Sequence, residues 1–197
     1  MNNFPLIKPK QNKYNEIVIL GDTIMDLNKF IAVYPDFPKP GISFKDISPL
    51  LKNPEAFKYA VTEMAKLARP YKPTLICGPE SRAFLFGAAL AQELGIGFVM
   101  ARKPGKLPGK TVCESYDLEY GQASLYVQEN SFSKTDRVLL IDDLVATGGT
   151  LCALKNIIIK QGATPVAVVT PIRLYELEGE KRVGLPVHAL LNLSDSH

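Results

Sequence analysis

The segment that most constrains how this chain can fold is VLLIDDLVATGGT at 138–150. It joins an aliphatic run, two adjacent carboxylates and a turn of small residues. Because 138–141 shows no polar alternation, it is typical of a strand buried on both faces of a parallel sheet. Asp142 and Asp143 follow the carboxyl end of that strand, where open α/β sheets bind their ligands. The segment therefore predicts an α/β fold with a ligand site at this edge.

The turn after the acidic pair predicts an anion site. Its small side chains let backbone N–H groups close on a phosphate at the start of the next helix. Neither a GxxxxGK[ST] loop nor a GxGxxG fingerprint is present. Two carboxylates would repel a bare polyphosphate, so they favour ribose hydroxyls or a divalent cation. The pattern predicts a site for a phosphorylated sugar, and the alternative is a solvated acidic turn before an ordinary helix. The residues of this turn are Ala146, Thr147, Gly148, Gly149 and Thr150.

Strand and helix patterns alternate along the rest of the chain. This alternation predicts an open, twisted, mostly parallel sheet flanked by helices. A cap at Asn53 should start one helix, and Gly95 should end another, whose inward residues would be Phe84, Ala88, Ala91 and Leu94. The expected strands are 74–77, 98–101, 124–128, 138–141 and 166–170. The expected helices run from residue 22 or 23 to about 32, from 54 to before 70, up to 94, and over 150–161. An ordered loop is expected at 34–51.

Composition excludes several classes of protein. The 197 residues are 22% charged and 46% hydrophobic with a net charge of +3, the profile of one ordinary globular domain. This charge is too small to indicate binding to nucleic acid or membrane. Three cysteines without CxxC spacing support neither a disulfide framework nor a zinc site. With no membrane-length apolar run and no signal-peptide pattern, we expect a soluble cytoplasmic protein.

Together, five segments resemble a known family. Segment 138–150 resembles the phosphoribosyl-pyrophosphate (PRPP) motif of the type I phosphoribosyltransferases. The other four resemble the adenine phosphoribosyltransferase branch of that family, and the resemblance runs from about residue 27 to the C-terminus. They are YPDFPKPGISFKDISPLL at 34–51, ESRAFLFGAALAQELG at 80–95, RKPGKLPG at 102–109 and YDLEYG at 116–121.

The resemblance implies a fold and a reaction. A single domain at 22–197 would carry an N-terminal hood at about 22–53 and a mobile lid loop at about 102–121, and 1–21 would be an extension of unknown role. Adenine would attack PRPP to give AMP and pyrophosphate in purine salvage, with Mg²⁺ as cofactor and a homodimer as the assembly. Two alternatives remain: transfer to hypoxanthine, guanine, xanthine or orotate, and a non-catalytic PRPP-binding regulator. About 21 extra residues are too few for the DNA-binding domain that such a regulator usually carries.

For the sugar and its phosphates, the resemblance implies roles in three loops. Asp142 and Asp143 would hold the ribose hydroxyls, directly or through waters of the metal, and 146–150 would bind the 5′-phosphate. Glu80, Ser81 and Arg82 would form the pyrophosphate loop, with a non-proline cis peptide between Glu80 and Ser81. Ala83 departs from the glycine common in relatives. In the lid, pyrophosphate would contact Arg102, Lys103 and Lys106.

For the base, the resemblance implies contacts from three further places. Glu119 would exchange a proton at the purine N7, and Tyr120 would help to order the closed lid. Phe44 would stack on the purine, and Leu144 would pack on its other face. Ser43 would read the edge of adenine through main-chain groups, so a serine can stand where relatives often have an apolar residue. Glu119, Arg82 and Tyr120 form the expected catalytic set.

Overall fold

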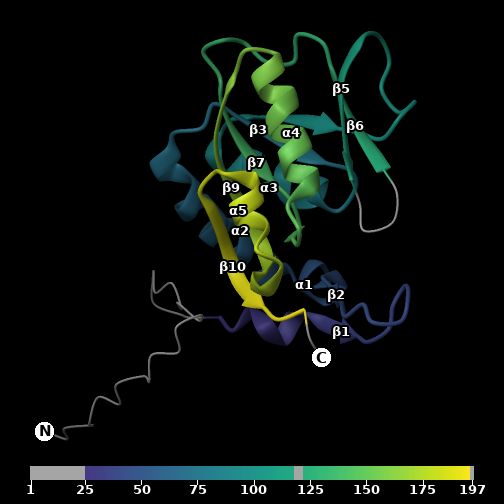
Figure 1. The fold of residues 1–197 in the computed structure, drawn as a ribbon. Coiled ribbons are helices and arrows are strands. Elements are labelled where there is room, and N and C mark those ends of the chain that lie inside the picture. The colour runs from purple at the N-terminus through teal and green to yellow at the C-terminus, as the bar shows by residue number, and fades with distance from the viewer. Residues whose placement is uncertain (1–24, 118–121, 196–197) are drawn as a thin grey trace, which may run out of the picture.

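A parallel sheet forms the centre of the molecule in the computed structural model, which describes residues 25–117 and 122–195 (Figure 1). Its strands lie in the order β10-β9-β7-β3-β4, with β8 paired to β9, and every pairing is parallel. The predicted buried strand β7 lies in the middle of this order. The strands are β3 (Leu75–Pro79), β4 (Gly97–Ala101), β7 (Arg137–Ile141), β8 (Leu144–Val145), β9 (Thr164–Leu174) and β10 (Val187–Leu193). The predicted fold class is confirmed.

Helices cover both faces of the sheet. Alternate residues of β7 point to opposite faces: Leu139 and Ile141 belong to the core beneath α2 (Pro54–Ala68) and α3 (Ala83–Leu94). Val138 and Leu140 belong to the core beneath α4 (Gly149–Lys160). All four residues are fully buried. The same strand therefore anchors both layers of the fold and leads directly to the predicted site.

Helix α2 begins and helix α3 ends where the sequence predicts. Asn53 caps α2 by accepting hydrogen bonds from the amides of Glu55 and Ala56, at 3.1 and 2.9 Å. Gly95 ends α3 in the left-handed conformation. The predicted inward face of α3 was wrong in part, because Ala91 is buried but Ala88 is exposed. Gly87, which apolar periodicity does not count, packs so closely on Phe98 that a Cβ would lie 2.4 Å from its ring. The buried face is Ala83, Phe86, Gly87, Leu90 and Ala91.

The N-terminal region contains short elements in place of one helix and one loop. Asp26 caps a 3₁₀ helix, η1 (Leu27–Phe30), so the predicted helix to residue 32 was too long; its expected caps, Asp22 and Thr23, lie outside the described residues. The expected loop at 34–51 includes β2 (Phe44–Asp46), which pairs antiparallel with β1 (Ala32–Tyr34), and α1 (Ser48–Lys52). β-branched and aromatic residues favour these strands.

The remaining elements lie after β4. Residues 103–110 contain no helix or strand, as expected, but β5 (Thr111–Asp117) was not predicted and pairs antiparallel with β6 (Gln122–Gln128). Also unpredicted are η2 (Arg69–Tyr71), η3 (Tyr175–Leu177), α5 (Gly179–Val183) and β10. Within the described ranges, no helix is both long and apolar enough to cross a bilayer.

Candidate active site

The acidic pair lies directly after β7, at the carboxyl edge of the sheet. The amide of Asp143 donates to Asp142 Oδ1 at 2.9 Å. Beyond β8, Gly148 adopts a left-handed conformation with φ of +77° and becomes the N-cap of α4. No side chain caps this helix start, so its first N–H groups are available to an anion. The predicted order of strand, acidic pair, turn and helix is present.

Electrostatics make the acidic pair receptive to a partner. Burial and the negative charge of Asp143 raise the pKa of Asp142 well above its usual value. Burial also raises the pKa of Asp143, although the Arg82 guanidinium acts in the opposite direction. Arg82 Nε lies 2.9 Å from Asp143 Oδ2, but this ion pair lacks hydrogen-bond geometry, and the buried Oδ2 has no hydrogen-bond partner. Hydroxyl donors or a cation would satisfy these carboxylates.

The same two carboxylates are the protein groups that fit Mg²⁺. In residues 25–117 and 122–195, no three His, Cys, Asp or Glu side chains gather closely enough to hold a metal on their own. Mg²⁺ commonly takes one or two carboxylates and fills its remaining positions with water and phosphate oxygens. Asp143 Oδ2, which forms an ion pair with Arg82 but no hydrogen bond, is an oxygen of this kind.

The loop after β3 faces the acidic pair. The Glu80–Ser81 peptide is cis, as the resemblance implied. Arg102 Nε donates to Glu80 Oε2 at 2.6 Å, and the Lys103 amide donates to Glu80 Oε1 at 3.1 Å. Partial burial alone would raise the pKa of Glu80, but these hydrogen bonds lower it overall. Glu80 and Arg102 therefore bind each other here, while Lys103 and Lys106 are exposed.

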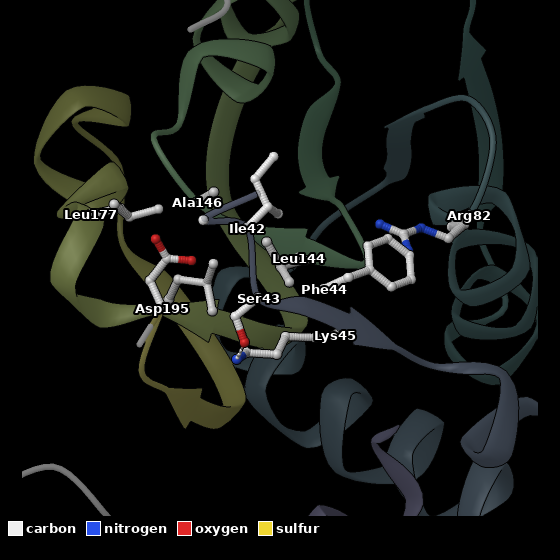
Figure 2. Close-up of a pocket in the computed structure, with 11 residues that line it drawn as sticks. Ile42, Ser43, Phe44, Lys45, Arg82, Leu144, Ala146, Leu177 and Asp195 are labelled. Carbon is white, nitrogen blue, oxygen red and sulfur yellow. Dashed lines mark hydrogen bonds between the residues drawn. The ribbon is translucent and has the colours of Figure 1, made fainter. Parts of the chain in front are cut away.

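Phe44 and Arg82 form one side of a cavity of about 240 Å³. The guanidinium carbon of Arg82 lies 5.2 Å from the centre of the Phe44 ring, and the ring centres of Phe37 and Phe44 lie 5.1 Å apart in an edge-to-face arrangement. Figure 2 shows the side chains of Phe44 and Arg82 next to each other, with Leu144 and Ser43 farther along the cavity. The structure thus brings together Ser43, Phe44 and Leu144, which the resemblance placed at the base, with Arg82 of the expected pyrophosphate loop and Ala146 of the phosphate turn.

Sequence reasoning missed other residues that line this cavity. Lys45 is buried, and its Nζ donates to the Ser43 hydroxyl at 2.6 Å; strand alternation from Ser43 could have placed the two side chains together. Asp195 comes from the C-terminal segment, where Glu176 Oε2 accepts its amide at 3.0 Å. No sequence pattern near Asp195 predicts this contact, because it depends on β10 lying beside the N-terminal elements. The remaining missed residues are Gly41, Ile42, Leu174 and Leu177.

Two members of the expected catalytic set, Glu119 and Tyr120, lie outside the described residues. In the turn, Gly148 and Gly149 are buried, whereas Thr147 and Thr150 are half-buried. Ser81, in the cis peptide, is exposed. The described part of the expected site therefore comes from four segments: residues 43–44, the loop after β3, the segment after β4, and residues 142–150 after β7.

Comparison with known proteins gives consistent results. The family model described as "Phosphoribosyl transferase domain" matches residues 48–185. An adenine phosphoribosyltransferase from Desulfitobacterium hafniense is 51% identical over 168 residues, which are 85% of this chain and 97% of the relative. One from Thermotoga maritima is 47% identical over 168 residues, 85% of this chain and 97% of the relative.

Solved structures agree with these relatives. Adenine phosphoribosyltransferase from Thermoanaerobacter pseudethanolicus is 42% identical, with a TM-score of 0.83 over 85% of this chain and 98% of that chain. The Saccharomyces cerevisiae enzyme, solved with adenine and an imino-altritol bisphosphate, is 35% identical, with a TM-score of 0.79 over 84% of this chain and 96% of that chain.

Proposed function

Because this chain belongs to the phosphoribosyl transferase family, and within it to the adenine phosphoribosyltransferases, we propose that it converts adenine and PRPP to AMP and pyrophosphate in purine salvage. The relatives favour this reaction over transfer to another base and over a non-catalytic regulator. A solved Trypanosoma brucei relative contains AMP, pyrophosphate and ribose-5-phosphate, which belong to the same chemistry.

The observation that carries this proposal is the position of Arg82. Its side chain contacts the acidic pair through Asp143, at 2.9 Å, and the face of Phe44, at 5.2 Å. The part of the expected site that binds the sugar phosphate and the part that binds the base therefore meet at Arg82. A sugar held at the carboxylates would have its anomeric carbon beside a base stacked on Phe44, which is the proximity that transfer between them requires.

Each described loop then has one task. Asp142 and Asp143 accept hydrogen bonds from the ribose hydroxyls, and the backbone at 146–150 donates to the 5′-phosphate. Ser43 reads the adenine edge through its main chain, while Phe44 and Leu144 pack on the two faces of the ring. The pyrophosphate is bound by Ser81, Arg82, Arg102, Lys103 and Lys106, with Glu80 holding Arg102 until substrate arrives.

The lid completes the chemistry in this proposal. Glu119 exchanges a proton with the purine N7 as the ring nitrogen changes its charge, and Tyr120 orders the closed lid. The proline and glycine residues of 103–110 suit a loop that opens for substrate and closes to exclude water. The hood would be about 22–53 and the lid about 102–121, in a single domain at 22–197 after an extension at 1–21.

Mg²⁺ is the cofactor that we propose, with Asp142 and Asp143 as its candidate protein contacts. Bound to the phosphates of PRPP, it would act as a Lewis acid that neutralises the developing charge of the leaving pyrophosphate. The two carboxylates keep the ribose end of the substrate oriented. Their raised pKa values support a cationic or hydroxyl partner in the working enzyme.

We further propose a cytoplasmic homodimer. Leu85 of α3 and Met100 of β4 are exposed large apolar side chains, and β4 is an edge strand of the central sheet. Apolar surface at a sheet edge is typical of an interface. Sedimentation of the purified chain should give twice the mass of 21.7 kDa, and a monomer at micromolar concentration would contradict the dimer.

One assay tests the function. Purified protein is incubated with PRPP and Mg²⁺, and adenine, hypoxanthine, guanine, xanthine and orotate are offered separately while pyrophosphate release is followed. We expect release with adenine, and AMP as the second product. Release with another base alone would show that the substrate assignment is wrong, and no release with any base would favour the regulator.

A further inference from the structure

Gly179, the first residue of α5, lies against the turn at 146–149. A Cβ added to Gly179 would lie 2.1 Å from the Ala146 carbonyl oxygen and 2.8 Å from the Gly148 nitrogen. A Cβ added to Gly148 would lie 2.4 Å from the Gly179 carbonyl oxygen. Real Cβ atoms do not approach backbone atoms this closely, so the two backbones touch only because both residues are glycine.

Space, not backbone conformation, requires the glycine at 179. Gly148 has a positive φ, which favours glycine by itself, but Gly179 is not among the residues with positive φ. An alanine could adopt the backbone conformation of Gly179 if the turn were not there. The identity of this residue is therefore determined by its contact with Ala146 and Gly148.

α5 is also attached to the helix that follows the turn. Lys155 Nζ donates to the Val183 carbonyl at 2.5 Å, and Cys152 Sγ donates to the Arg182 carbonyl at 3.0 Å. Both donors lie in the first two turns of α4, and the Val183 side chain is fully buried in the core beneath α4. The contact at Gly179 is thus one end of a docked element.

The turn needs this support because it has little bulk of its own. Its sequence, ATGG at 146–149, offers few side-chain contacts to fix the backbone. N–H groups bind an anion best when their directions are set before the ligand arrives. α5 touches the turn at both the Ala146 carbonyl and the Gly148 amide region, and so can set those directions.

We propose that Gly179 is a positioning residue for the 5′-phosphate of PRPP. By allowing α5 to lie against Ala146 and Gly148, it holds the N–H groups of the turn toward the phosphate. The proposal rests on the phosphate-binding role proposed above for 146–150. It is a claim about one substrate, because the base contacts Phe44 and Leu144 lie on other elements.

Gly179→Ala tests this role against Gly184→Ala at the other end of α5. Gly184 has a φ of +65°, so its substitution strains the backbone, but the new Cβ would meet only Lys155 Nζ at 3.8 Å. We expect Gly179→Ala to raise the KM for PRPP by about tenfold or more, since a misplacement of about 1 Å can cost on the order of 100-fold. The KM for adenine should change less than twofold, and Gly184→Ala should leave the KM for PRPP unchanged.

Binding in the absence of turnover separates this proposal from the proposed function. Calorimetry with AMP, and with PRPP alone, should show the same loss of affinity in Gly179→Ala even if the wild type proved inactive toward adenine. If Gly179→Ala does not fold, Lys155→Met loosens α5 without a clash and should raise the KM for PRPP by about fivefold, the cost of one hydrogen bond. Equal losses for PRPP and adenine, or an unchanged affinity for PRPP in a folded variant, would overturn the positioning role.

Discussion

The two halves of the site are built from very different parts of the fold. The acidic pair and phosphate turn follow β7, whose residues 138–141 are fully buried and which pairs with a strand on each side. Phe44 comes from β2, which pairs with β1 in a sheet of two three-residue strands. There, Val33 is 50% exposed and Phe37 is 53% exposed. One half is anchored in the core, and the other lies at its surface.

This difference matches what each ligand part demands. A phosphate is held by backbone N–H groups, whose directions must be fixed in advance. A flat base enters between two side chains, so at least one wall must move aside to admit it. Segments with few buried contacts open at a lower free energy than core strands. The fold thus binds the sugar phosphate at a site anchored in the core and the base at a surface segment that can open.

The largest contrast should appear in stability. Ile141→Ala removes a fully buried side chain from β7 and should lower the free energy of unfolding by about 2–5 kcal/mol. Val33→Ala in β1 should change it by less than about 0.5 kcal/mol, because this side chain is half exposed. Urea unfolding of both variants measures the difference. Similar losses would show that the N-terminal sheet is as firmly anchored as the centre.

Asp142 should show a conflict between stability and function in the anchored half. Asp142→Asn removes an acceptor of the ribose hydroxyls and should lower kcat/KM for PRPP by about 30-fold, typical of a lost charged hydrogen bond. The same change should raise the melting temperature of the ligand-free protein, because burial and Asp143 disfavour the ionised carboxylate. Thermal unfolding and steady-state kinetics give the two results.

The stability that Asp142→Asn gains over the wild type should increase with pH. The pKa of Asp142 is raised in the folded state, so the folded protein holds this proton more tightly than the unfolded chain does. Wild-type stability is therefore lost as pH rises from about 3.9, the unfolded pKa, through the raised folded pKa. The advantage of Asp142→Asn should grow over that range and then level off. An advantage that shrinks with rising pH would contradict the raised pKa.

The anchored half was also the half that the sequence predicted well. An unbroken aliphatic run, a DD pair and a Gly-rich turn are local signals, and the strand, acidic pair, turn and helix follow in the expected order, although the two-residue strand β8 was not predicted. In the N-terminal half the predicted helix was too long and two strands were missed, since these three-residue strands are too short for periodicity to detect. Asp195 and the α5 contact at Gly179 depend on segments distant in the chain, so no local pattern could reveal them, whereas strand alternation from Ser43 could have revealed Lys45. Glu119 and Tyr120 rest on the resemblance alone.

Phe44 should affect only the base. Phe44→Ala removes the stacking face and should raise the KM for adenine by about 5- to 150-fold, since stacking a base on an aromatic side chain contributes about 1–3 kcal/mol. The KM for PRPP should change much less, although Arg82 loses its contact with the ring. Phe44→Tyr keeps the face and serves as the control. An equal rise for both substrates would show that the two halves do not act separately.

The smallest effect should come from the buried hydrogen bond beneath Phe44. Lys45 and Ser43 flank Phe44 on β2 and its approach, and their side chains meet on the buried side at 2.6 Å. This hydrogen bond links the residues on both sides of Phe44 and so restrains the position of its ring. Its loss should therefore raise the KM for adenine by about fivefold.

Ser43→Ala and Lys45→Met remove the same bond from opposite ends, which makes a double-mutant cycle informative. If the bond is what matters, each single variant should raise the KM for adenine, and the double variant should be no worse than the more affected single one. Ser43→Ala leaves a buried ammonium without its acceptor and should be the less stable of the two. Additive effects on the KM would instead mean that Lys45 and Ser43 act on the base independently. The position of Phe44 would then depend on the main chain alone and not on this hydrogen bond.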